Sequence, residues 1–289
     1  MQIDQLRLDL DLRKRVKLRL RQQNDFKRIL DVLKAQSATR HFKSLQAFQK
    51  EFLNCPKAIS KINPVMSTLL STNTKLEKGS TLNWTTRGLS LAPANLSGKQ
   101  LCPHRSPGCE LACLNTAGMG VFSNVQEARI NKSKLLIENR EEFLAKLNKE
   151  LTLLNKKALK GTQIAVRLNV LSDIPWYNMI DMESYKNLRF YDYTPNMARM
   201  IEFLQGKLPT NYHLTFSRKE NNQSKVELIS SMGGNVAVVF DKLPETYLGK
   251  PVIDGDVSDL RFLDPKGVIV GLKAKGKGKK DRSGFVIKA

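Results

Sequence analysis

Long apolar runs are missing from this sequence of 289 residues. No stretch approaches the roughly 20 apolar residues that a membrane-spanning helix needs. The first residues, Met1–Arg7, contain no apolar signal core. These two absences predict a cytoplasmic protein that has no membrane partner.

Cysteine and histidine are scarce as well, with 4 and 3 residues respectively. Four cysteines are too few for a disulfide scaffold in a chain of this length, so in a reducing compartment we expect thiols or metal ligands. The sequence has no H-E-x-x-H, Walker A or G-x-S-x-G pattern. The usual sequence evidence for a zinc protease, a P-loop nucleotidase or a serine hydrolase is therefore lacking.

Acidic residues are few relative to basic ones, because 27 Asp and Glu stand against 48 Lys and Arg, a net charge of +21. Residues 1–61 hold 15 basic and 6 acidic side chains, and residues 266–289 hold 8 and 1. Basic ends around a balanced centre favour nucleic acid as the partner. The residues predicted to contact it are Arg13, Lys14, Arg15, Lys17, Arg19, Arg21, Lys277, Lys279 and Lys280. The Gly/Lys-rich tail that carries the last three is expected to be mobile.

Residues 1–75 are predicted to form a basic, mainly helical segment. Asn24 can cap a helix, and Phe42, Leu45, Phe48 and Phe52 recur at helical spacing. The first twenty residues fit two structures, because their apolar residues alternate as in a strand and also fall four apart as in a helix; we favour a strand. Residues 54–80 are rich in Pro, Ser, Thr, Asn and Lys, which predicts a domain boundary near residue 75.

Residues 76–289 alternate between short apolar segments and helical patterns. The expected strands are Leu82–Leu91, Ile164–Leu168, Leu188–Tyr193, His213–Phe216, Asn235–Phe240, Val252–Ile253 and Val268–Leu272. The expected helices are Ser123–Leu159, Met197–Leu204 and Gln223–Ser231. Such a series predicts an α/β fold with a βα barrel-like sheet, complete or partial, and an open doubly wound sheet is the runner-up.

Three of the four cysteines lie within twelve residues, in the segment that follows the first expected strand. Cys102, Cys109 and Cys113 have the spacing C-x6-C-x3-C, and His104 lies between the first two. Thiolates are soft ligands that suit zinc or an iron–sulfur cluster. Loops after the strands of a βα series are also where active sites gather. We therefore expect a metal site of three cysteines, preferably iron–sulfur, with His104, Cys55 or an outside ligand in the fourth position; three incidental thiols are the alternative.

Polar residues follow several other expected strands and would form one pocket if those strand ends converge. The catalytic candidates are Asp173, Asp192, Arg218 and Asp254. The substrate-binding candidates are Asn169, Ser217, Asn221, Lys273 and Lys275. Taken singly, the same residue types also serve as helix caps and turns.

Several blocks of the sequence resemble one protein family. The blocks are Ser90–Pro93, Cys102–Gly118, Arg167–Asp173, Phe190–Thr194, Leu214–Arg218, Val252–Asp256, Arg261–Asp264 and Gly271–Lys275. They are similar to a family of phage and plasmid proteins often called gene-product-eighty-eight-like. The likeness covers roughly residues 80–287 and implies kinship, and a host-cell cytoplasmic location if a phage encodes the chain, but no settled activity.

A second resemblance, to radical SAM enzymes, rests on the cysteine loop after the first strand of a βα barrel. Their usual spacing is C-x3-C-x2-C, and this chain departs from it. The likeness implies an iron–sulfur cluster with S-adenosylmethionine on its open iron. The leading hypothesis is accordingly an iron–sulfur enzyme that acts on nucleic acid. The alternatives are a non-catalytic nucleic-acid-binding protein with structural zinc and a carboxylate-metal nuclease that uses Asp173, Asp192, Glu220 and Asp254.

Overall fold

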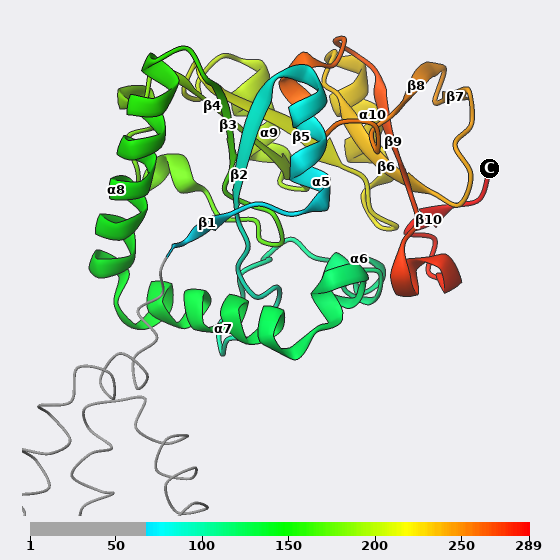
Figure 1. Ribbon diagram of the computed structural model, residues 1–289. Coiled ribbons are helices and arrows are strands. Elements are labelled where there is room, and N and C mark those ends of the chain that lie inside the picture. Colours follow the sequence, from blue (N-terminus) through cyan, green and yellow to red (C-terminus); the bar gives the residue numbers. More distant parts are fainter. Residues whose placement is uncertain (1–67) are drawn as a thin grey trace, which may run out of the picture. The chain divides into compact units, whose positions relative to one another are not determined.

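The computed structural model describes residues 68–289, which form a mixed α/β unit around one ten-stranded sheet (Figure 1). This unit begins at Thr68. It therefore includes several residues that precede the boundary predicted near residue 75. The expectations for the first 67 residues, among them the basic residues between positions 13 and 21 and the ligand candidate Cys55, fall outside the described residues.

Most strands of the sheet arise from the apolar segments of the sequence. In chain order they are β1 (Leu70–Ser71), β2 (Trp84–Leu89), β3 (Gln163–Arg167), β4 (Leu188–Thr194), β5 (Tyr212–Ser217), β6 (Val236–Phe240), β7 (Thr246–Tyr247), β8 (Lys250–Asp254), β9 (Ile269–Lys273) and β10 (Val286–Ile287). All seven expected strands are present. The structure adds β1, β7 and β10, each of two residues.

The strands of the sheet lie side by side in the order β1-β2-β3-β4-β5-β6-β9-β8-β7. From β2 to β8 every neighbouring pair is parallel, and β10 pairs with the end of β6, also in parallel. Strands β2 to β6 thus follow one another in chain order, as in a barrel, without the central reversal of a doubly wound sheet. Among the described residues, however, the order runs from β1 to β7 with no pair that joins them, so these hydrogen bonds do not close a complete barrel.

Helices connect the strands. The α-helices are α5 (Thr74–Glu77), α6 (Pro107–Leu111), α7 (Ser123–Glu138), α8 (Arg140–Leu159), α9 (Met197–Leu204) and α10 (Gln223–Ser231). The 3-10 helices are η2 (Lys78–Leu82), η3 (Leu114–Thr116), η4 (Gly118–Val121), η5 (Trp176–Asn178), η6 (Met182–Ser184), η7 (Arg261–Leu263) and η8 (Gly276–Lys280). The single long helix expected from Ser123 to Leu159 is two helices, because Asn139 leaves the helical conformation and its side chain accepts from the Glu142 N–H to cap α8.

Neighbouring residues of β4 show that the two faces of the sheet are covered differently. Tyr191 packs with Leu260 and with Phe262 of η7. Asp192, the next residue, points to the opposite face because successive strand side chains alternate. Helix α8 contacts β3 and β4, α9 contacts β4 and β5, and α10 contacts β5 and β6. This alternation decides which of the polar residues at the strand ends can meet.

The described part of the chain has no helix that is both long and apolar enough to cross a membrane.

His213 of β5 gives the fold a testable pH dependence. Its buried Nε2 has no hydrogen-bond partner, and its ring packs edge-on against Phe203 at a centroid distance of 5.2 Å. Burial, with a contribution from Arg261, lowers the pKa of His213 to about 4. The unfolded chain therefore takes up this proton near pH 6.5 and the folded chain only near pH 4, so stability is lost as the pH falls through that interval.

We expect His213→Phe to lose less stability than the parent between pH 7 and pH 5, by about 2 kcal/mol. Urea unfolding of both proteins at the two pH values measures this difference directly. Equal losses in parent and variant would show that His213 does not titrate differently in the two states.

Candidate functional site

The cysteine loop, residues 101–117, lies at the carboxyl ends of the parallel strands and is tied to several of them. The Asp173 N–H, after β3, donates to the Leu101 carbonyl at 2.9 Å. The Cys102 thiol donates to the Leu171 carbonyl at 3.1 Å. His104 is exposed, and its Nε2 lies 3.0 Å from Nδ2 of Asn196, which follows β4. The loop therefore spans the ends of β3 and β4.

Glu220 and Lys219, which follow β5, anchor the same loop. The two Glu220 carboxylate oxygens accept from the Ser106 hydroxyl at 2.7 Å and the Gly108 N–H at 2.8 Å. The Lys219 ammonium donates to the His104 carbonyl. A Cβ at Gly108 would stand 2.2 Å from the Ser283 Oγ and 2.9 Å from the Glu220 carboxyl carbon, so this close approach requires glycine. Sequence analysis missed Lys219 and this role of Glu220, because neither has a local pattern.

Cys102, Cys109 and Cys113 form no disulfide and are all half-buried. Burial raises the pKa of the Cys102 thiol, and the charges of Cys109 and Asp173 raise it further. Burial likewise raises the pKa of Cys113 to about 11, and Cys109 and Cys102 add to the rise. The three thiols are therefore near enough for the charge of one thiolate to raise the pKa of another.

Two cations oppose this rise. The Lys219 charge lowers the pKa of Cys102, and the Arg129 charge, from α7, lowers that of Cys113. Arg129 also donates to the Asn115 side-chain oxygen at 2.6 Å, which places it under the end of the loop. Nearby cations favour the thiolate form, the form that binds a metal.

The candidate ligand side chains of the described residues are not arranged as a metal-binding site. Within residues 68–289 no three His, Cys, Asp or Glu side chains converge at metal-ligand spacing. His104 and the three cysteines therefore do not converge as a metal-ligand set. The four carboxylates of the nuclease hypothesis do not converge either.

Asn169 and Asp192 are buried together, and each hydrogen-bonds to other residues of the domain. The Asp192 carboxylate accepts from the Asn169 N–H at 2.7 Å, from Asn169 Nδ2 at 3.1 Å and from the Tyr212 hydroxyl at 3.0 Å. The Asn169 side-chain oxygen accepts from Ser172, Ile174 and Trp176. Burial raises the pKa of Asp192 to about 7. This pair organises the loop after β3.

Asp173 forms a separate buried pair with Arg199 of α9. Asp173 Oδ1 accepts from Arg199 Nη1 at 2.7 Å and from the Thr194 hydroxyl at 3.0 Å. Asp173 Oδ2 and Arg199 Nε are buried without a partner. Of the predicted catalytic carboxylates, Asp173 is the one whose charge acts on Cys102.

The remaining predicted residues lie in other places. Asp254 pairs with Lys273 at 3.0 Å, and Lys275 pairs with Asp256 at 2.6 Å, so these predicted residues form an exposed ionic group. Arg218 donates to the Gly284 and Phe285 carbonyls of the C-terminal segment. Ser217 accepts through its carbonyl from Asn222. Asn221 is exposed.

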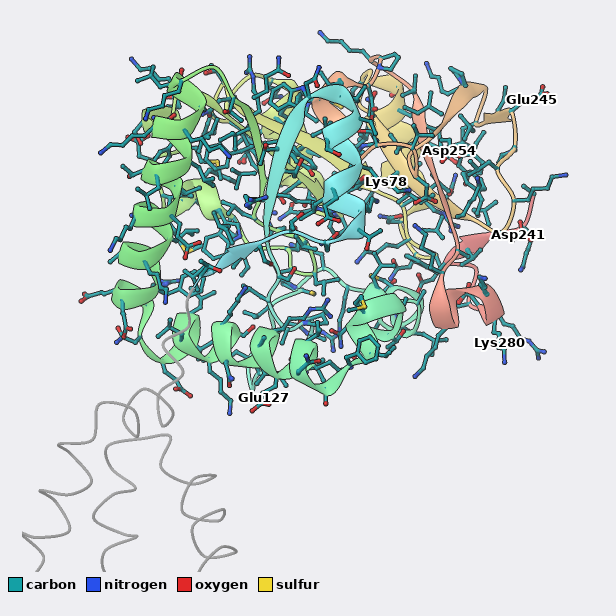
Figure 2. The ribbon with its side chains drawn as sticks, in the orientation of Figure 1. Lys78, Glu127, Asp241, Glu245, Asp254 and Lys280 are labelled. Atoms are coloured by element: carbon teal, nitrogen blue, oxygen red, sulfur yellow. The ribbon has the colours of Figure 1, made fainter. Side chains whose placement is uncertain are left out.

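The Lys/Gly-rich segment that was expected to be mobile has defined secondary structure. Residues 276–280 form η8, and Val286–Ile287 form β10 beside β6. Asp281 closes the turn between them, because its carboxylate accepts from Ser283 and from the Val286 N–H. Figure 1 shows η8 and β10 beside α6, at the same end of the sheet as the cysteine loop. The predicted phosphate-contacting residues Lys277, Lys279 and Lys280 are nevertheless exposed, and Figure 2 shows Lys280 projecting away from the domain.

These features define a mixed α/β protein with a thiol-bearing loop at the carboxyl edge of a largely parallel sheet. The family model described as Gene product 88 matches residues 67–289. The chain therefore belongs to the Gene product 88 family, which confirms the first resemblance; nothing in the match supports the likeness to radical SAM enzymes. Comparison with curated proteins and with solved structures found no match.

Proposed function

We propose that this protein is an iron–sulfur enzyme that acts on nucleic acid in the cytoplasm of the host cell. The observation that carries the proposal is the grouping of three uncrosslinked thiols in one loop at the carboxyl edge of a sheet whose strands β2 to β6 follow in chain order. In βα folds this edge is where reacting groups gather. As part of this proposal, we interpret the sheet as a partial βα barrel.

The donor set suits an iron–sulfur cluster. Cys102, Cys109 and Cys113 supply three soft ligands, and the negative charges of neighbouring thiolates add to the effect of burial in raising the pKa of Cys102 and of Cys113. A bound metal would offset the effect of those charges. Binding would also require the thiols to converge further, and Cys102 would release its hydrogen bond to Leu171.

The protein residues around the loop have separate tasks in this proposal. Glu220 holds the start of α6, which carries Cys109, by accepting from Ser106 and Gly108. Lys219 and Arg129 favour the thiolate forms of Cys102 and Cys113. A cluster with three cysteine ligands would supply redox chemistry and an open iron for a small ligand, of which S-adenosylmethionine is the one that the weaker resemblance implies.

Nucleic acid is the proposed partner because basic residues are in excess at both ends of the chain. In the described part, exposed Lys277, Lys279 and Lys280 lie on η8, which packs against η3 at the end of the cysteine loop. Phosphates bound there would place a strand beside Cys113.

Anaerobic purification of the full chain, followed by iron, sulfide and zinc analysis of one sample, tests the metal. We expect iron and sulfide with broad visible absorbance and loss of both in Cys102→Ala. Cys55→Ala removes the other candidate cysteine ligand and should retain both, because the proposed cluster has three cysteine ligands and an open iron. Stoichiometric zinc without iron would instead favour a non-catalytic nucleic-acid-binding protein with a structural metal. An unchanged iron content in Cys102→Ala, or no metal in the parent, would overturn the proposal.

A further inference from the structure

An exposed apolar surface begins within the cysteine loop and continues past its end. Five large apolar side chains fall within twelve residues, and each is at least 43% exposed. We call them the apolar lip: Leu111, Leu114, Met119, Val121 and Phe122. Scattered apolar residues on a protein surface need no explanation, whereas a contiguous group marks an interaction site.

The local fold holds these side chains outward while polar groups point inward. Between Leu114 and Met119, Asn115 is buried and accepts from Arg129. Gly120 is also buried, and a Cβ there would stand 2.7 Å from the Leu114 carbonyl oxygen. This arrangement, in which an amide is buried and the neighbouring apolar residues are exposed, reverses the usual preference of both residue types.

The lysines of η8 lie beside the apolar lip. A Cβ at Gly276 would stand 2.8 Å from the Ala117 Cβ, and one at Gly278 would stand 3.3 Å from the Ala112 Cβ, so η8 packs closely on the segment that carries the lip. Lys277, Lys279 and Lys280 are exposed, and the ion pairs of the described residues do not include them. The only acid of residues 266–289 is Asp281, which is buried. Within residues 266–289 the lysines of η8 therefore have no acidic side chain on the surface beside them.

We infer that the apolar lip and the η8 lysines together bind single-stranded nucleic acid, with the phosphates on the lysines and unpaired bases against the apolar side chains. Proteins bind single strands by combining a basic track with aromatic side chains on which bases stack, and Phe122 is the aromatic side chain of the lip. A duplex would present its phosphates to the lysines but keep its base faces stacked and away from Phe122 and Met119. This inference rests on the proposed nucleic-acid function and specifies the form of nucleic acid that reaches the cysteine site.

Fluorescence anisotropy with a labelled single strand of about 12 nucleotides and with a duplex of the same sequence tests the inference on the full chain. We expect Met119→Ser with Phe122→Ser to weaken single-strand binding about tenfold or more and to leave duplex binding unchanged, because only the base contacts are lost. The matched control is Leu153→Ser with Leu159→Ser on α8, which removes comparably exposed apolar side chains and should change neither affinity.

Replacing Lys277, Lys279 and Lys280 with Gln should weaken single-strand binding and lower its salt dependence, by a slope of about 2 for three phosphates. Equal losses on single strand and duplex in the Met119/Phe122 variant, or no loss on either, would overturn the inference. Loss of binding to anionic phosphatidylserine vesicles, with oligonucleotide binding intact, would assign the surface to a membrane instead and also overturn it. Iron content, measured on each variant, keeps this outcome separate from the fate of the metal proposal.

Discussion

Asp259→Ala should destabilise the domain by about 3–5 kcal/mol, because it removes the anion from a buried group of cations. Asp259 is 1% exposed. It accepts from Arg167 at 3.0 Å, from the Tyr191 hydroxyl at 2.9 Å and from the Tyr193 hydroxyl at 3.2 Å. Lys75 of α5 adds an ion pair at 3.2 Å. One carboxylate thus joins α5, β3 and β4 on the η7 face of the sheet.

The electrostatic effect on Asp259 shows why its loss would be costly. Burial alone would raise the pKa of this carboxyl, but Arg167 and Lys75 outweigh burial and hold the pKa well below its usual range. Without the carboxylate, Arg167 would remain buried as an unpaired charge. Its remaining partner would be the Tyr193 ring, whose centroid lies 4.5 Å from the guanidinium carbon.

Urea unfolding at pH 7 measures the loss. The control is Asp254→Ala, which removes a partly exposed carboxylate that pairs with Lys273 and accepts from the Asp256 N–H, and should cost only about 1 kcal/mol. A loss in Asp259→Ala as small as in the control would mean that water or an ion reaches Arg167 and Lys75 in the folded protein.

Much of the sheet could be predicted from the sequence, because each long strand is a separate apolar segment between polar ones. The segment Asn235–Phe240 is an example: it is almost entirely apolar and becomes β6, buried on both faces. The three strands that were missed have two residues each. Their pairing depends on tertiary contacts, as at Leu70, whose N–H donates to the Glu150 side chain 80 residues away.

The C-terminal segment was predicted to be mobile because Gly and Lys dominate it. The structure uses those glycines for close packing: Gly276 has a positive φ of 52° and lies against Ala117, and Gly278 is buried against Ala112. Composition reports the low apolar content of such a segment. Composition does not show that glycine, which has no side chain, lets one backbone segment pack closely on another.

The position of the candidate site could also be predicted, but not which polar residues belong to it. The cysteine loop was located by its place after a strand. Asp192 and Tyr191 are neighbours in β4 and go to opposite faces, so Asp192 joins Asn169 and Tyr212 whereas Tyr191 joins Asp259. The notion of one pocket for all strand ends ignored this alternation.

Asp173→Ala is expected to destabilise the domain by about 3–5 kcal/mol as well, for a related reason. Asp173 and Arg199 are each 4% exposed and are joined at 2.7 Å. Removing the carboxylate leaves the guanidinium buried without its anion. The backbone N–H of Asp173, which donates to the Leu101 carbonyl, is kept in this variant, whereas the charge that acts on Cys102 is lost.

The double variant Asp173→Asn with Arg199→Met separates the charge pair from every other role of Asp173. It removes both charges and keeps an acceptor for the Thr194 hydroxyl, so we expect most of the lost stability to return. Urea unfolding of the parent, Asp173→Asn, Arg199→Met and the double variant measures this recovery as a double-mutant cycle. If Asp173→Ala alone cost under about 1 kcal/mol, Arg199 would already be compensated by another anion. The double variant could instead stay as unstable as the single Asp173 variant. Asp173 Oδ2, which is buried without a hydrogen-bond partner, would then serve a contact other than Arg199. Because the Asp173 charge acts on Cys102, that contact would be sought at the cysteine site.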